Sequence, residues 1–404
     1  MTADGNSENG RDLFRLQNPA LIVGVLATIG LLVGAFTDTD QFFRSYLMGW
    51  ILLVMISAGS LGLLMMQYLT GGRWGVLIRR PAEAAAGTIP IVGLAFIPLL
   101  IGMHSVWEWS HAEVVQHDAL VRHKEPYLNA PFFTGRAIFF FIFWSVMAFL
   151  LVRWSKRLDV HHDRWVELRM RKLSGFGLVA LTLTLSFASV DWLMSLEPHW
   201  FSTMYGISFV VGCLLSAWAV LTISVVLLSQ TPPYAGVVEA QIFRDLGNLM
   251  FAFVMLWAYT AFSQFLLIWY ANIREETPYY VVRAQGGWGV IAAVLLVFHF
   301  FLPFTLLLMR AIKDRPRTLG MVAALMLFMR MVDLFWITAP AFRQGGHGGE
   351  AASHGSSFHL SWMDPLAFIA LLSLWTVFYL RRLAARPLLP EYEPYVKEAL
   401  GHAS

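Results

Sequence analysis

Long apolar runs recur along the whole chain, and their length limits how it can fold. A helix needs about 20 mainly apolar residues to cross a ~30 Å hydrocarbon core, and 57% of the residues are hydrophobic while 14% are charged. The runs do not alternate apolar and polar residues as membrane β-strands do. The sequence therefore predicts an all-α integral membrane protein with ten transmembrane helices. We expect them near residues 20–36, 46–69, 87–106, 137–154, 176–196, 204–228, 249–271, 289–309, 319–338 and 362–380.

Lysine and arginine are divided unevenly between the two sides of these predicted helices. Of the 29 basic residues, 21 fall on the side that holds both termini, seven fall on the opposite side, and Arg330 lies within a span. Because loops rich in Lys and Arg stay in the cytoplasm, we expect both termini to be cytoplasmic. The domains are then an N-terminal tail at 1–18, a transmembrane domain at 19–381 and a C-terminal tail at 382–404. The small excess of Lys and Arg over Asp and Glu is explained by membrane topology, so no nucleic-acid partner is expected.

The chain contains a single cysteine, Cys213, inside the sixth apolar run. Iron–sulfur clusters, c-type haem attachment, thiolate-rich zinc sites and disulfides all need more than one thiol. The Gly- and His-rich segment 340–360 also lacks a metal-ligand spacing. We therefore expect this chain to hold neither a cofactor nor a metal ion.

Three charged or titratable side chains fall deep inside predicted helices, where each costs at least a few kcal/mol. Arg330 and Asp333 are three residues apart and share a helix face. They form either a self-neutralising pair that holds helices together or part of a proton or quinone path. His299 is expected in the inner half of the bilayer, as a proton relay, a hydrogen-bonded structural side chain or, with a second histidine, a haem ligand.

Titratable side chains also gather at both ends of the predicted helices. An inner group at the start of the seventh run would let protons enter and an outer group would release them, although the helix dipole alone explains acidic residues at a helix start. Asp364, which precedes Pro365, is explained by helix capping. The outer group is His104, Glu108, Asp191, Glu197 and His199, and the inner group is Glu239, Arg244 and Asp245.

Four long motifs stand out along the chain: Gln67–Glu83, His104–His111 with Lys124–Phe133, Ser189–Thr203, and Trp257–Thr277. Together they resemble the NrfD/polysulfide-reductase type of membrane subunit found in bacterial Alternative Complex III. The similarity extends over nearly the whole chain, and motifs of this length are far more specific than a short pattern. Segment 340–360 has no counterpart in it.

The resemblance implies ten helices, eight of them in two four-helix bundles, within a quinol:electron-acceptor oxidoreductase of the quinol:cytochrome c type. Iron–sulfur clusters and c-type haems would lie on an iron–sulfur subunit and multihaem cytochrome c subunits. An ActC-like paralogue would oxidise quinol, and this chain would contribute a proton path or conformational coupling within the lipid bilayer. Asp191, Tyr259 and Gln264 enter the predicted path because they stand in the matching motifs, whereas His299, Arg330 and Asp333 enter it by depth alone.

Three other functions remain open at this stage. The chain itself could form the quinol-oxidising site, or it could be a scaffold, because each buried charge also has a structural explanation. A stand-alone secondary transporter is the third, since transporters often have Gly- or Pro-broken helices around a midplane site. Pro90 and Pro98 interrupt the third run and Pro303 the eighth, but no polar cluster suited to a solute accompanies them.

Overall fold

The computed structural model describes residues 5–161, 163–232, 234–236, 238–343 and 358–390. This part of the chain is all-helical and contains ten helices long and apolar enough to cross a membrane, which confirms the predicted number. The uninterrupted spans are α1 (Gly5–Thr37), α2 (Thr39–Thr70), α9 (Ala130–Val160), α10 (Arg164–Trp192), α11 (Met204–Leu228), α12 (Ala240–Ala271), α17 (Pro316–Thr338) and α18 (Met363–Ala384).

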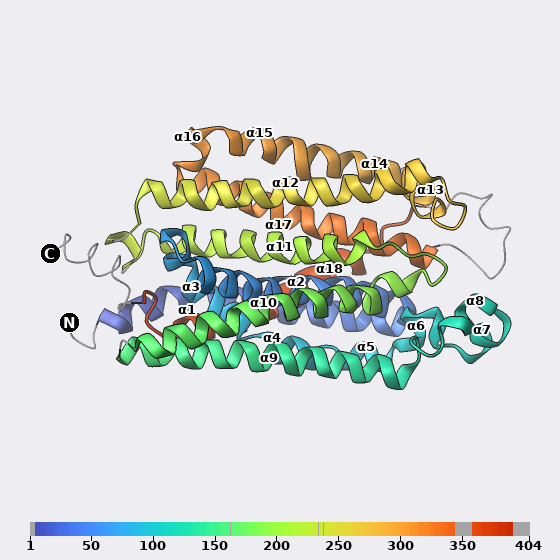
Figure 1. The fold of residues 1–404 in the computed structure, drawn as a ribbon, viewed down its shortest axis with the longest axis horizontal. Coiled ribbons are helices and arrows are strands. Elements are labelled where there is room, and N and C mark those ends of the chain that lie inside the picture. The colour runs from blue at the N-terminus through green and yellow to red at the C-terminus, as the bar shows by residue number, and fades with distance from the viewer. Residues whose placement is uncertain (1–4, 162, 233, 237, 344–357, 391–404) are drawn as a thin grey trace.

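The spans lie side by side along the long axis of the molecule (Figure 1). The start of α1 and the end of α18 lie at the same end of it, at the left of the view, as the predicted topology requires. The short helices α6 (Met103–Val106), α7 (Ala112–His117), α8 (Ala119–Lys124) and α13 (Pro278–Ala284) lie at the opposite end, which we call the outer end.

Helix α2 forms the centre of the molecule and packs against α10, α11 and α18. Small residues allow the closest of these contacts. A Cβ atom on Gly59 would lie 2.1 Å from the carbonyl oxygen of Cys213 in α11, so only glycine lets the two backbones approach this closely. Helix α1 packs on α18 and leaves its other face exposed.

The third span is broken into α3 (Arg73–Ala86), α4 (Ile89–Leu94) and α5 (Ile97–Ile101). Pro90 and Pro98 stand at the starts of α4 and α5, as the sequence predicts, because proline lacks the N–H that would continue the helix. Side chains of α2 bind two carbonyl groups of the broken span. Trp50 Nε1 donates to the carbonyl of Val92 at 2.9 Å and the Tyr46 hydroxyl donates to that of Ala95 at 2.8 Å.

The eighth span is also interrupted. It consists of α14 (Gly286–Val294), a π-helical turn η4 (Leu295–Phe301) and α15 (Leu302–Leu308), with Pro303 at the start of α15. A π turn widens the helix and changes the direction in which the following side chains point, and such turns are frequent at functional sites. His299 lies within this turn.

At the inner end, charged side chains tie the segment after α18 to α3 and α9. Arg386 pairs with Glu83 and with Asp159, and Arg80 pairs with the same two carboxylates. Ser155 donates to Glu83 and completes the cluster. The span that begins at residue 74 is therefore longer than the predicted run 87–106, because its charged first turns are neutralised by partners distant in sequence.

Candidate functional site

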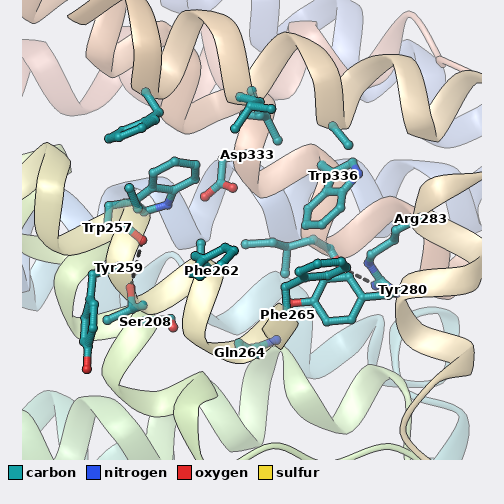
Figure 2. A pocket seen from close by; sticks show the side chains of 18 of the residues that line it. Ser208, Trp257, Tyr259, Phe262, Gln264, Phe265, Tyr280, Arg283, Asp333 and Trp336 are labelled. Carbon is teal, nitrogen blue, oxygen red and sulfur yellow. Dashed lines mark hydrogen bonds between the residues drawn. The ribbon is translucent and has the colours of Figure 1, made fainter. Parts of the chain in front are cut away.

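A cavity of about 900 Å³ lies among α11, α12, α13, the α14–α15 span and α17. Its walls are mainly aromatic and aliphatic, and Figure 2 shows the side chains that project into it. A small number of polar groups within an apolar wall is typical of sites that bind and orient a ligand. The polar residues are Tyr205, Ser208, Tyr259, Thr260, Gln264, Tyr279, Tyr280, Arg283, Arg330 and Asp333.

Arg330 and Asp333 form a buried ion pair at one wall of the cavity. Their side chains are 2% and 5% exposed, and Arg330 Nη1 contacts Asp333 Oδ2. The guanidinium also donates to the Ser216 hydroxyl at 3.3 Å. Gly212 makes room for it, because a Cβ atom there would lie 2.5 Å from Arg330 Nη2. The structure thus brings together the two charges that the sequence placed on one helix face.

Trp257 connects this ion pair to His299. Its indole N–H faces the carboxylate of Asp333 (Figure 2), and its ring packs edge-on against His299 with centroids 3.9 Å apart. His299 is fully buried, and neither ring nitrogen has a hydrogen-bond partner within the described part of the chain. Since buried polar groups are normally paired, an unpaired imidazole beside an ion pair is unusual for a purely structural residue.

A second ion pair lies at the outer end of the cavity. The Arg283 guanidinium donates to both Glu197 oxygens, at 2.9 and 3.2 Å, and to the backbone carbonyls of Tyr279 and Ile337. The Arg283 side chain is fully buried and lies over the Tyr279 ring, 3.5 Å from its centroid. Burial raises the pKa of Tyr279 and of Tyr280 above the usual value, so both phenols stay protonated.

Sequence reasoning missed the roles of Trp257, Arg283 and the Glu197 carboxylate in this site. Trp257 opens one of the four long motifs, and Arg283 is one of the seven basic residues on the poorly charged outer side. The sequence places Glu197 among the outer titratable residues but does not indicate that Arg283 is its partner. Each of these residues can be found in the sequence, but the contacts that bring them into one site are made between helices distant in sequence.

Asp191, expected beside the relay, lies in a different part of the molecule. It does not line the cavity, and it accepts hydrogen bonds from Arg136 of α9 at 2.8 and 2.9 Å. Arg136 in turn lies over the Tyr127 ring, 3.8 Å from its centroid. Trp192, which follows Asp191 in the chain, belongs to a cluster of contacting aromatic rings with Trp50, Phe96, Phe140, Phe141 and Trp144.

The other outer residues form local contacts away from the cavity. His104 in α6 contacts the Ser110 hydroxyl at 3.0 Å, and Glu108 begins the short helix η1 (Glu108–Ser110). Asp364 lies in the first turn of α18 and accepts from the backbone N–H of Ser361 at 3.0 Å, whereas Trp362, which precedes the helix, makes no side-chain capping hydrogen bond. No described contact joins these residues to the cavity.

The remaining predicted residues all lie on α12. Tyr259 and Gln264 line the cavity, where Gln264 is buried against Tyr280 and Tyr259 is 65% exposed toward the outside. Glu239 precedes the first turn of α12, and Asp245 accepts from Gln241 at 3.1 Å. The latter two therefore lie at the inner end of the helix, remote from the cavity along its length.

No group of three or more His, Cys, Asp or Glu side chains in the described ranges is placed to hold a metal ion. His347 and His354 lie outside those ranges, and His359 is exposed. No family model matches the chain, and no curated protein matches it significantly.

Proposed function

We propose that this chain is an ActF-type membrane subunit of an Alternative Complex III-like quinol:electron-acceptor oxidoreductase. In it the chain carries protons, or couples conformational change, and holds no redox centre of its own. The four long motifs, the ten spans and the single cysteine support the proposal. Its partners are an ActC-like paralogue, an iron–sulfur subunit and multihaem cytochrome c subunits in a bacterial inner membrane, with both termini cytoplasmic.

We also propose that eight spans form two four-helix bundles. The first would contain α2, the broken third span, α9 and α10, and the second α11, α12, the α14–α15 span and α17. Contacts of α10 with α9 and α2, and of α11 with α12 and α17, support this division. Helices α1 and α18, which pack on each other, would then lie outside both bundles.

The buried group of Arg330, Asp333, Trp257 and His299 is the observation that carries the proton role. Asp333 lies 17 residues from the start of α17, or roughly 26 Å along the helix at 1.5 Å per residue. An imidazole with two free nitrogens accepts a proton at one while the other can donate. Protonation of Asp333 removes its ion pair with Arg330, which leaves the guanidinium bound to Ser216. In the proposed relay the pair would therefore have two arrangements, one with Asp333 ionised and one with Asp333 protonated.

Contacts in the cavity favour Glu197 over Asp191 as the outer end of the proposed path. Glu197 is joined to the cavity through Arg283, whereas Asp191 is bonded to Arg136 and does not line the cavity. At the inner end, Lys313 donates to Asn248 at 2.7 Å and Arg244 pairs with Asp314. Protons would enter between these groups and the half-buried Asp245.

The test compares two matched substitutions in the reconstituted complex. Asp333→Asn removes a carboxylate from the proposed path, and Asp191→Asn removes an equally buried carboxylate outside it. We expect Asp333→Asn alone to lower the number of protons released per electron. An unchanged ratio in Asp333→Asn would refute the proposed relay.

A further inference from the structure

The cavity has a second property, which the proton role does not require: its shape and lining fit a lipid-soluble ligand. We propose that it binds one uncharged molecule whose polar end carries hydroxyl or carbonyl oxygens. The volume of about 900 Å³ lies near the upper end of the roughly 300–1,000 Å³ that ligand pockets occupy. A ring or glycerol head with an alkyl chain has a suitable size.

Aromatic side chains enclose the middle of the cavity. Trp257, Phe262 and Trp336 lie around the carboxylate of Asp333, and Phe265 and Tyr280 line the part of the cavity nearer Arg283 (Figure 2). Broad apolar faces around a few polar atoms bind the hydrophobic body of a ligand and orient its polar end.

The charges in the lining indicate that the ligand is uncharged. Arg330 is neutralised by Asp333, and Arg283 is neutralised by Glu197. A charged ligand in this apolar interior would lose its hydration without gaining an unpaired counter-charge, which costs several kcal/mol. A neutral ligand avoids that cost.

Hydrogen-bonding groups remain for the oxygens of a neutral ligand. The Asp333 carboxylate accepts from a hydroxyl group, and the Gln264 amide both donates and accepts. The Ser208 hydroxyl also lines the cavity, and it has no partner within the described part of the chain. Donors and acceptors therefore stand on α11, α12 and α17, around one space.

Access is from the bilayer. Tyr259 and Phe262 of α12 and Leu296 and Phe301 of η4 all line the cavity, and each is more than half exposed on the outside of the molecule. These residues lie in the middle of their spans, at the depth of the lipid tails. A molecule dissolved in the membrane can therefore reach Asp333 without passing through water.

The experiment uses the assembled complex in lipid nanodiscs, without turnover, so that binding is measured independently of the proton role. The probe is a decyl-substituted benzoquinone bearing a diazirine on its chain, and cross-linked peptides are identified by mass spectrometry. We expect cross-links on α12 and η4. Competition with unlabelled decylbenzoquinone and with monoolein shows whether a ring or an acyl ester is preferred, and either result supports the site.

Two substitutions test the location. Ala261→Phe fills the cavity, and its matched control Ala252→Phe places the same ring on an exposed position of α12 outside it. We expect labelling to fall at least about tenfold in the first and to be unchanged in the second. Gln264→Leu, which keeps the volume but removes hydrogen bonds, is expected to weaken binding about fivefold, as loss of one such bond does.

Three outcomes would overturn the proposal. They are the absence of cross-links on α12 and η4, equal labelling of Ala261→Phe and Ala252→Phe, and competition by the anion oleate as strong as that by monoolein. Failure of the proton measurement with intact labelling would remove the relay and leave the binding site.

Discussion

Replacement of Arg330 by methionine leaves the Asp333 carboxylate buried without its ion-pair partner. Asp333 is 4% exposed, and its other neighbours are apolar or neutral. Removing one member of a buried pair costs about 3–5 kcal/mol, whereas replacing both members by apolar residues is often neutral or stabilising. We therefore expect Arg330→Met to lower the free energy of unfolding by about 3–5 kcal/mol. Most of that loss should return in Arg330→Met/Asp333→Leu.

Reversible unfolding of the purified chain in mixed micelles, followed by tryptophan fluorescence, measures these free energies. The two single variants and the double variant form a cycle that isolates the interaction between the side chains. If Arg330→Met costs less than about 1 kcal/mol, or if the double variant is as unstable as the single one, Arg330 and Asp333 do not stabilise each other as a buried ion pair. Proton release should be lost in the double variant even though its stability returns, which separates function from stability.

Three further predictions concern other parts of the chain. Gly59→Ala should destabilise the fold by several kcal/mol through overpacking of α2 against α11, whereas Gly135→Ala, which meets nothing within 4 Å, should not; equal melting temperatures would contradict the close contact. Partial burial raises the pKa of Asp118. The hydrogen bonds from the N–H groups of Val121 and Leu120 and the contact with His199 outweigh this effect, so that the pKa falls below the usual 3.8. The stabilisation of α8 should be present above pH 3.8 and be lost as the pH falls through the folded pKa. Protection of the α8 amides from hydrogen exchange, corrected for the intrinsic pH dependence of exchange, that stays constant down to pH 2 would refute this. Arg386→Ala should increase proteolysis after α18, because it removes two ion pairs, and Arg386→Lys should do so less; identical cleavage of all three proteins would show that these pairs do not anchor the segment.

Hydropathy and helix periodicity predicted what depends on local sequence. The number of spans, the breaks at Pro90 and Pro98 and the shared face of Arg330 and Asp333 all follow from spacing along one helix. The position of Asp364 in the first turn of α18 follows in the same way. None of these features needs information about which helices are neighbours.

The parts that sequence reasoning could not supply depend on tertiary contacts. The π turn at η4 directs His299 toward Trp257, and no pattern in the eighth run signals that turn. Asp191 enters the predicted path because it stands in a matching motif, but the structure pairs it with Arg136 on α9. The predicted third run, 87–106, excludes the charged first turns of the span, because their partners Arg386 and Asp159 are distant in sequence.

Infrared difference spectroscopy of the complex during quinol oxidation tests the central claim most directly, because it detects protonation of single buried carboxylates. We predict a protonated-carboxyl band that disappears in Asp333→Asn and persists in Asp191→Asn. A band that survives in Asp333→Asn, or one that disappears only in Asp191→Asn, would contradict a proton relay at Asp333.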